Sequence, residues 1–456
     1  MIHATKLLSE FAYHLKFSDL PKETVETTKL FITDYFAACF AGKTVNTVFN
    51  RAVENVVLDM GGKEESSVLF SNKKLPSPCA AFINAVYAHG ADMDDGNRKA
   101  MGHVGAHVIS AVFAVAEVLK SSGEDIITAI NVGYDVYNRV ASAVQPGLVH
   151  RGFHSTGTAG AIACAAAAGK LMGFTQEQIY NAMSLAAIQA SGLIIIAESG
   201  QSCKPINPAN AAKTGILSAR IIAEGVKSSA YPLESDKGFF HAMSDKVDES
   251  MITDGLGKKF TVDESYLKPY PSCRHTHCGI EAILKIRDRM IENGAEIHSD
   301  GIKAIKVFIY NNAIKIAGKI EIPQTPEDSK FSIHYSLAVA LLKGHFQIAD
   351  LDISDLDSSV EHIINVTKLI PDESMENRDK GIRGAKVEVE LTDGQTYCET
   401  VLIPKGDPEN PFTWADMYDK MNGVIIDGYH TDTVINNIRA LDKIKKFTTI
   451  SMFFEV

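Results

Sequence analysis

Apolar residues recur at helical spacing along most of the first 245 residues of this 456-residue chain. Leu7, Leu8, Phe11 and Leu15 form the first such pattern, which is typical of an amphipathic helix with one buried face. The same spacing predicts helices at 80–87, 104–119, 126–144 and 175–190. Pro21 is placed to begin another helix, and Thr175 with Gln178 forms a capping-box motif at the start of the last one. The first part of the chain is therefore predicted to be a large all-helical domain.

Residues 155–169, STGTAGAIACAAAAG, consist almost entirely of small side chains. A helix with so little side-chain bulk lets neighbouring backbones approach closely, so we expect it at the centre of the helical domain. A phosphate-binding loop is the alternative interpretation, but Lys170 is followed by Leu171, and the glycine spacing does not match that motif.

The pattern changes near residue 260. Residues 302–309 mix apolar and charged positions as a half-buried strand does. Residues 387–391 and 397–402 flank Asp393-Gly394, a sequence typical of a hairpin turn. Helices are predicted at 280–290, 332–342, 414–421 and 431–444. We therefore predict a mostly α fold, in which a helical domain of residues 1–267, completed by 405–456, is interrupted by a smaller α+β lid domain of residues 268–404.

Composition and charge narrow the function classes. The formal net charge of −11 argues against nucleic acid and anionic membrane as partners, because both select clustered lysine and arginine. A small anionic substrate needs only a local cationic pocket. The seven cysteines are scattered and odd in number, as in a reducing compartment. The N-terminus lacks the apolar run of a signal peptide, and the most apolar windows are too short for a membrane span, so we expect a cytoplasmic protein.

The segment from Tyr87 to His107 concentrates titratable side chains between two helices predicted to form the core. Its polar residues are Asp92, Asp94, Asp95, Arg98, His89, His103 and His107. Buried carboxylates and imidazoles are costly unless they are paired, and such clusters gather at functional sites. A solvated loop with a few helix caps is the alternative.

Other polar groups lie at predicted element boundaries. They are Arg151, His154, Lys204, Lys268, Arg274, His275, His277, Ser332 and Tyr335. Cys273, His275, His277 and Cys278 invite a zinc interpretation, but their spacing fits no usual ligand motif, so no metal is predicted. Carboxylates, imidazoles and lysines without a cofactor motif suit proton abstraction next to a carboxylate, and we therefore predict no cofactor.

The order of these motifs resembles the MmgE/PrpD family, which includes 2-methylcitrate dehydratase, cis-aconitate decarboxylase and iminodisuccinate epimerase. The matching segments are His89-Gly-Ala-Asp92-Met-Asp94-Asp95 with His103, Arg151-Gly-Phe-His154, Ala187-Ile-Gln-Ala-Ser-Gly192, Lys204-Pro with Asn210-Ala-Ala, Lys268-Pro-Tyr-Pro-Ser-Cys273 with His277, and Ser332 with Tyr335. The resemblance implies a helical domain, an α+β lid, an active site between them, no required cofactor or metal, and a homodimer.

The resemblance also implies site residues. Asp92, His103, His154, Lys204 and Lys268 match the catalytic set, and Arg151, His277, Ser332 and Tyr335 are candidates for substrate binding. Members often have His-Pro where this chain has His103-Val104. They often have Lys-Pro-Leu-His-x-Gly where it has Lys204-Pro-Ile-Asn207-Pro208. Both departures would lie at the pocket, so the substrate can differ from those of the named family members.

These observations lead to one mechanistic hypothesis. A lyase that needs no cofactor acts on a small di- or tricarboxylate, with His103, held by Asp92, as the base and His154 as the acid. Lys204 and Lys268 bind carboxylates, and Lys268 arrives with the lid. Dehydration as in 2-methylcitrate dehydratase is favoured, while decarboxylation and epimerisation remain open on the same scaffold. A non-catalytic helical binding protein is the alternative from another class.

Overall fold

The structure is a computed structural model that describes residues 2–45, 47–197, 202–354, 356–377 and 381–455. The chain forms two compact units. We call them the helical unit, Met1–Gly90, Asp94–Tyr266 and Thr413–Val456, and the α+β unit, Ala91–Met93 and Leu267–Phe412. The fold is mostly α with a smaller α+β part, as predicted. The predicted boundaries at 268 and 404, and the lid role, stay predictions.

The helical unit is built from helices, with one short strand pair of β1 (Ser66–Ser67) and β2 (Lys74–Leu75). Its helices are α1 (Ala4–His14), α2 (Lys22–Val45), α3 (Val48–Met60), α4 (Ser77–Gly90), α5 (Gly105–Leu119), α6 (Gly123–Ser142), α7 (Gly147–His150), α8 (Ser155–Leu171), α9 (Gln176–Ile188), α10 (Ile206–Ala223), α11 (Phe239–Met243), α12 (Ser250–Thr253), α18 (Trp414–Asn422) and α19 (Thr431–Arg439).

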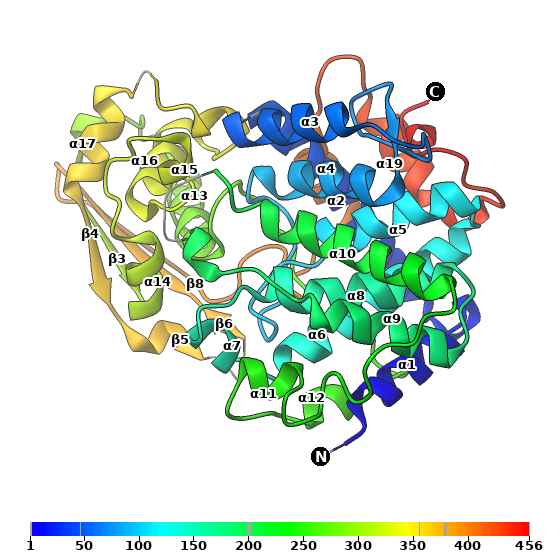
Figure 1. The fold of residues 1–456 in the computed structure, drawn as a ribbon. Coiled ribbons are helices and arrows are strands. Elements are labelled where there is room, and N and C mark those ends of the chain that lie inside the picture. Colours follow the sequence, from blue (N-terminus) through cyan, green and yellow to red (C-terminus); the bar gives the residue numbers. More distant parts are fainter. Residues whose placement is uncertain (1, 46, 198–201, 355, 378–380, 456) are drawn as a thin grey trace. The chain divides into compact units, whose positions relative to one another are not determined.

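Helix α8 is the centre of the helical unit. It packs against α5, α6, α9 and α10 (Figure 1), and every residue from Ser155 to Gly169 is buried. Its small side chains permit this: a Cβ added to Gly215 of α10 would lie 2.3 Å from the Cβ of Cys164. The segment is helical throughout, so the predicted central helix is confirmed and the phosphate-loop alternative is not supported.

The α+β unit contains a four-stranded sheet of order β4-β3-β7-β8. Its strands are β3 (Ile302–Ile309), β4 (Thr367–Pro371), β7 (Ala385–Leu391) and β8 (Thr396–Val401). The β7–β8 hairpin and β3 confirm the predicted strands, and β7 alternates buried and half-buried residues. Strand β4 pairs in parallel with β3 and was not predicted. Two further short strands, β5 (Glu376–Asn377) and β6 (Ile382–Arg383), pair with each other.

The α+β unit also contains five α-helices in its described residues. They are α13 (His277–Glu292), α14 (Asn311–Ala317), α15 (Pro326–Ser329), α16 (Ile333–Lys343) and α17 (Ser358–Val366). Helix α13 packs on β7 and β8, and α16 packs on α13. These two confirm the predicted helices at 280–290 and 332–342, whereas α17, which leads directly into β4, was missed.

No helix in the described ranges combines the length and the apolar character that a membrane span requires.

The close contact between α8 and α10 makes a prediction about stability. Gly215→Ala would place a methyl group 2.3 Å from the Cβ of Cys164 and 2.7 Å from the backbone nitrogen of Ala165, so the two helices would have to separate. We expect the free energy of unfolding to fall by about 1–3 kcal/mol, measured by urea denaturation followed by circular dichroism.

Gly423→Ala is the matched control, because Gly423 has a φ of −73° and its added Cβ would have its nearest neighbour at 3.5 Å. Equal stability of the two variants would contradict the packing argument.

Candidate active site

Two histidines of the helical unit share one buried carboxylate. The Nδ1 of His89, in the last turn of α4, lies 2.8 Å from Oδ2 of Asp94, and the Nδ1 of His103 lies 3.4 Å from the same oxygen. The two rings meet edge to face, with centroids 4.7 Å apart. The side chains of His89 and Asp94 are buried, whereas that of His103 is 12% exposed. His103 is therefore the more accessible of the two rings.

The contacts of His103 fix its tautomer. Its Nδ1 lies 2.8 Å from the main-chain carbonyl oxygen of Asp95, and a carbonyl oxygen can only accept a hydrogen bond. Nδ1 must therefore carry a proton, and in the neutral ring Nε2 holds the lone pair. This arrangement suits a group that takes up and returns a proton at Nε2, because Asp94 and the Asp95 carbonyl stabilise the cation.

The same residues are candidate metal ligands. The ligand atoms of His89, Asp94 and His103 all lie within 4.8 Å of one another. Ligand atoms around a tetrahedral zinc ion are roughly 3.3 Å apart, whereas 2.8 Å separates Nδ1 of His89 from Oδ2 of Asp94. That distance is typical of a hydrogen bond, in which a proton lies between the two atoms. The donors fit proton transfer better than metal binding, and the predicted absence of a metal stays a prediction.

Asp95 caps helix α5 from inside the core. Its Oδ1 accepts a hydrogen bond from the backbone N–H of Gly105 at 2.7 Å, and its Oδ2 accepts one from the hydroxyl of Tyr134 at 2.7 Å. Burial and the negative charge of Asp94 raise the pKa of Asp95 from 3.8 to about 7, although the two hydrogen bonds act in the opposite direction. Asp95 therefore releases its proton only near neutral pH.

The loop that presents His103 is seated on the first turn of α8. The backbone N–H of His103 donates to Oγ1 of Thr156 at 3.1 Å, and Oγ of Ser155 donates to the carbonyl of Met101 at 3.0 Å. Gly102 lies between these contacts, where an added Cβ would come within 2.2 Å of the Tyr137 hydroxyl and 2.4 Å of Oγ of Ser155. Only glycine permits this approach.

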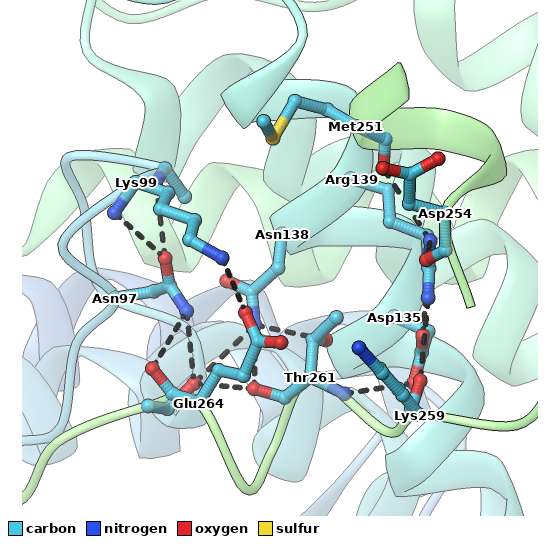
Figure 2. Close-up of polar contacts among 12 residues, drawn as sticks. Asn97, Lys99, Asp135, Asn138, Arg139, Met251, Asp254, Lys259, Thr261 and Glu264 are labelled. Carbon is cyan, nitrogen blue, oxygen red and sulfur yellow. Dashed lines mark hydrogen bonds and ion pairs between the residues drawn. The ribbon is translucent and has the colours of Figure 1, made fainter. Parts of the chain in front are cut away.

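A polar network at the end of α6 also holds the segment to which the same loop is bonded (Figure 2). Arg139 pairs with Asp135 at 2.8 Å and donates to the main-chain carbonyls of Ile252, Asp254 and Lys259 at 3.2, 2.9 and 3.2 Å. These bonds hold the segment that precedes Tyr266 against α6.

That segment then pairs with the loop. The Nδ2 of Asn97 donates to the carbonyl of Glu264 at 3.2 Å, and Nδ2 of Asn138 donates to Oγ1 of Thr261 at 3.0 Å. Gly96 and Tyr266 exchange two backbone hydrogen bonds, of 3.0 and 2.8 Å. The loop is thus fixed at both ends, which keeps the ring of His103 in place.

His154 and Lys204 approach the same helix terminus. His154 is the buried N-cap residue of α8, and its Nδ1 lies 3.0 Å from Nδ2 of Asn207 in the first turn of α10. Lys204 belongs to the turn that begins α10, because the backbone N–H of Asn207 donates to its carbonyl at 3.4 Å. The structure therefore gathers His103, His154 and the turn of Lys204 around the N-terminus of α8.

The other two predicted catalytic residues pair within the α+β unit. Nζ of Lys268 donates to the carbonyl of Asp92 at 2.7 Å and forms an ion pair with its Oδ1 at 3.3 Å. Both side chains are buried, and Asp92 has a φ of +53°. The predicted pairing of Asp92 with His103 stays a prediction.

Two of the predicted substrate-binding residues, Tyr335 and Ser332, make hydrogen bonds within the α+β unit. The hydroxyl of Tyr335 donates to the carbonyl of Asp350 at 2.6 Å, and Ser332 is the N-cap of α16. Burial and the charges of Arg274 and Lys268 lower the pKa of His277 well below its usual value, so His277 is neutral.

Arg151 is engaged at the surface of the helical unit. Its guanidinium donates to the carbonyls of His241 and Ala242 and forms an ion pair with Asp245. The side chain is 33% exposed. We therefore leave Arg151 out of the mechanism below, and its substrate-binding role stays a prediction.

Sequence reasoning did not assign several residues of the site. They are His89, Asp94, Asp95, Tyr134, Thr156 and Asn207. The first three lie in the segment that the sequence singled out, but a sequence does not say which of three neighbouring aspartates faces a given histidine. Asn207 was noted only as a departure from the family pattern.

Comparison with known proteins identifies the family of this chain. Residues 6–251 match the MmgE/PrpD N-terminal domain, and residues 270–442 match the MmgE/PrpD C-terminal domain. The chain belongs to the MmgE/PrpD family. The two matches cover most of both structural units. Helices α18 and α19, which lie in the helical unit, fall in the C-terminal match.

Several MmgE/PrpD relatives align over nearly the whole chain. A cis-aconitate decarboxylase of Aspergillus terreus is 26% identical, covering 98% of this chain and 94% of the relative. The cis-aconitate decarboxylase of Homo sapiens is 25% identical with the same coverage, and that of Mus musculus is 23% identical, covering 98% of this chain and 92% of the relative.

The raised pKa of Asp95 predicts how stability depends on pH. The folded state keeps this proton up to about pH 7, whereas the unfolded chain releases it near pH 4. The contribution of Asp95 to stability is therefore fully present below about pH 4 and is lost as the pH rises to about 7. Asp95→Asn has nearly the same shape and does not ionise. The stability of this variant relative to the wild type should increase from about pH 4 to about pH 7, by roughly 4 kcal/mol at most.

Urea unfolding at a series of pH values measures this difference. Asp236→Asn, at an exposed carboxylate, is the control and should give the same pH profile as the wild type. A stability difference between D95N and the wild type that does not change with pH would contradict the prediction.

Proposed function

We propose that this protein is a lyase that needs no cofactor and acts on a small di- or tricarboxylate. The observation that supports this best is the geometry of His103, whose Nδ1 donates to the Asp95 carbonyl at 2.8 Å and whose Nε2 therefore exchanges the proton. Decarboxylation of cis-aconitate or a close analogue is the first reaction to test, because the relatives reported above bear that name.

In a decarboxylation of this kind, the C–C bond to the departing carboxylate breaks and its electron pair forms a new C=C bond. The former alkene carbon must then take a proton. Protonated His103 supplies it from Nε2 and returns to the neutral form. Asp94 stabilises the cationic ring of His103 before the transfer. As CO2 leaves, negative charge develops on the remaining substrate carboxylates, and nearby hydrogen-bond donors must stabilise it.

The cationic side chains supply this stabilisation in our proposal. Lys204, in the turn before α10, and Lys268, paired with Asp92, bind substrate carboxylates, and His154 assists as the predicted acid. An ammonium group suits this task because it is a compact charge with three donors. The substrate would be the predicted small anion. A homodimer and a cytoplasmic location remain part of the proposal.

The same residues permit two other outcomes. A neutral His103 could remove a proton next to a carboxylate, and loss of hydroxide would then give dehydration, as in 2-methylcitrate dehydratase. Return of the proton to the opposite face would give epimerisation. Dehydration was the reaction favoured from the sequence. The names of the relatives are the reason to test decarboxylation first.

An NMR assay separates the three reactions. The enzyme is incubated in deuterated water with cis-aconitate, 2-methylcitrate and a panel of D- and L-amino dicarboxylates. Itaconate carrying deuterium would support decarboxylation, a new unsaturated tricarboxylate dehydration, and deuterium exchange without a new compound epimerisation. Turnover or exchange with none of them would contradict the proposal and favour the alternative of a non-catalytic binding protein.

His103→Gln tests the proposed proton transfer. Glutamine cannot exchange a proton, so we expect kcat on the accepted substrate to fall by about 10²-fold or more. His298→Gln is the control, because the side chain of His298 is 66% exposed and pairs only locally with Glu296, and its kcat should match the wild type. Near-normal activity of H103Q would rule out His103 as the proton donor.

A further inference from the structure

The ring of His154 is held by a contact that the mechanism above does not use. Nδ2 of Asn207 lies 3.0 Å from Nδ1 of His154. Both side chains are buried. Either end of an amide can face an imidazole nitrogen, so the tautomer of His154 depends on which end of Asn207 is turned toward it.

The surroundings of Asn207 decide its orientation. The same Nδ2 lies 3.4 Å from the main-chain carbonyl oxygen of Leu193, which only accepts hydrogen bonds. That carbonyl is fixed in place, because Leu193 and Phe153 form an antiparallel bridge. Backbone hydrogen bonds of 2.9 Å from His154 to Gly192 and from Ile194 to Gly152 flank the bridge. Reversing the amide would place Oδ1 against the Leu193 oxygen, so the NH₂ end must face both acceptors.

We infer that Asn207 is a positioning residue that holds His154 as the neutral tautomer with its proton on Nε2. An amide NH₂ group that donates to Nδ1 requires a lone pair there, and the ring proton must then be on Nε2. An amide does not titrate, so Asn207 presents the same donor to His154 wherever the ring is neutral.

The two imidazoles at the N-terminus of α8 therefore have opposite tautomers. His103 has its proton on Nδ1 and a lone pair on Nε2, because its Nδ1 faces the Asp95 carbonyl. His154 has its lone pair on Nδ1 and its proton on Nε2. This assignment rests on the proposed function in one respect: it makes His103 the group that exchanges the proton and His154 a neutral donor to a substrate oxygen, which refines the role of His154 as the acid.

Nitrogen NMR of the full-length protein tests the tautomer without any substrate. The 15 histidines are labelled with ¹⁵N, and the His154 signals are identified by their loss in His154→Gln. We expect a pyrrole-like, protonated Nε2 and a pyridine-like Nδ1 at neutral pH. A protonated Nδ1 in the wild type would overturn the inference. This measurement on the wild-type protein does not depend on any variant of Asn207.

Asn207→Asp shows whether Asn207 is the cause. A carboxylate only accepts, so the ring proton should move to Nδ1 of His154, and kcat should fall by about 10²-fold or more if His154 donates from Nε2. Asn437→Asp is the control, because Nδ2 of Asn437 donates only to main-chain carbonyls near the C-terminus, and it should leave the His154 signals unchanged. His154 signals in N207D identical to the wild type would also overturn the inference.

The two proposals fail in different ways. If no substrate of the panel is turned over while His154 shows the expected tautomer, the proposed function fails and the positioning role stands. If turnover is found and Nδ1 of His154 is protonated, the proposed function stands and the role of Asn207 is wrong.

Discussion

The close approach of Gly102 to the first turn of α8 determines the geometry of the candidate site. A side chain at this position would collide with the Tyr137 hydroxyl and with Oγ of Ser155, so glycine is required for the loop to reach the helix. The contact places the backbone of His103 on Thr156, two residues from His154. Proton transfer requires groups that are held within a fraction of an ångström. Here that precision comes from the loop backbone lying directly against the short side chains of Ser155 and Thr156, which hydrogen-bond to it.

Around this contact the protein buries several titratable side chains. Asp94 and Asp95 are adjacent and both are buried, and burying like charges is costly. The structure reduces that cost in three ways. Two histidines share Asp94, the N–H of Gly105 and the hydroxyl of Tyr134 donate to Asp95, and the raised pKa of Asp95 lets it hold a proton. Nδ1 of His103 therefore faces oxygen atoms that accept hydrogen bonds, the carbonyl of Asp95 and Oδ2 of Asp94.

Much of the fold could be predicted because it follows from periodicity. The spacing of apolar residues located α5 and α9, and Asp393-Gly394 located the β7–β8 hairpin. Strand β4 was missed because it is a short edge strand that ends at Pro371 and follows α17 without a turn. The segment of the site was identified from its density of titratable groups. Its internal pairing was not, because Asp92 and Met101 adopt positive φ angles, which redirect side chains in a way that no periodic pattern reveals.

The assignment of Ala91–Met93 to the α+β unit has a consequence for how such proteins can evolve. Lys268 is buried against Asp92, a residue that lies 176 positions earlier in the chain. A gene fragment encoding Leu267–Phe412 alone would leave that ammonium group without its counter-ion. Residues Leu267–Phe412 therefore cannot be exchanged between relatives by themselves. Recombination would also have to exchange the matching residues Ala91–Met93, which the chain places between two segments of the helical unit.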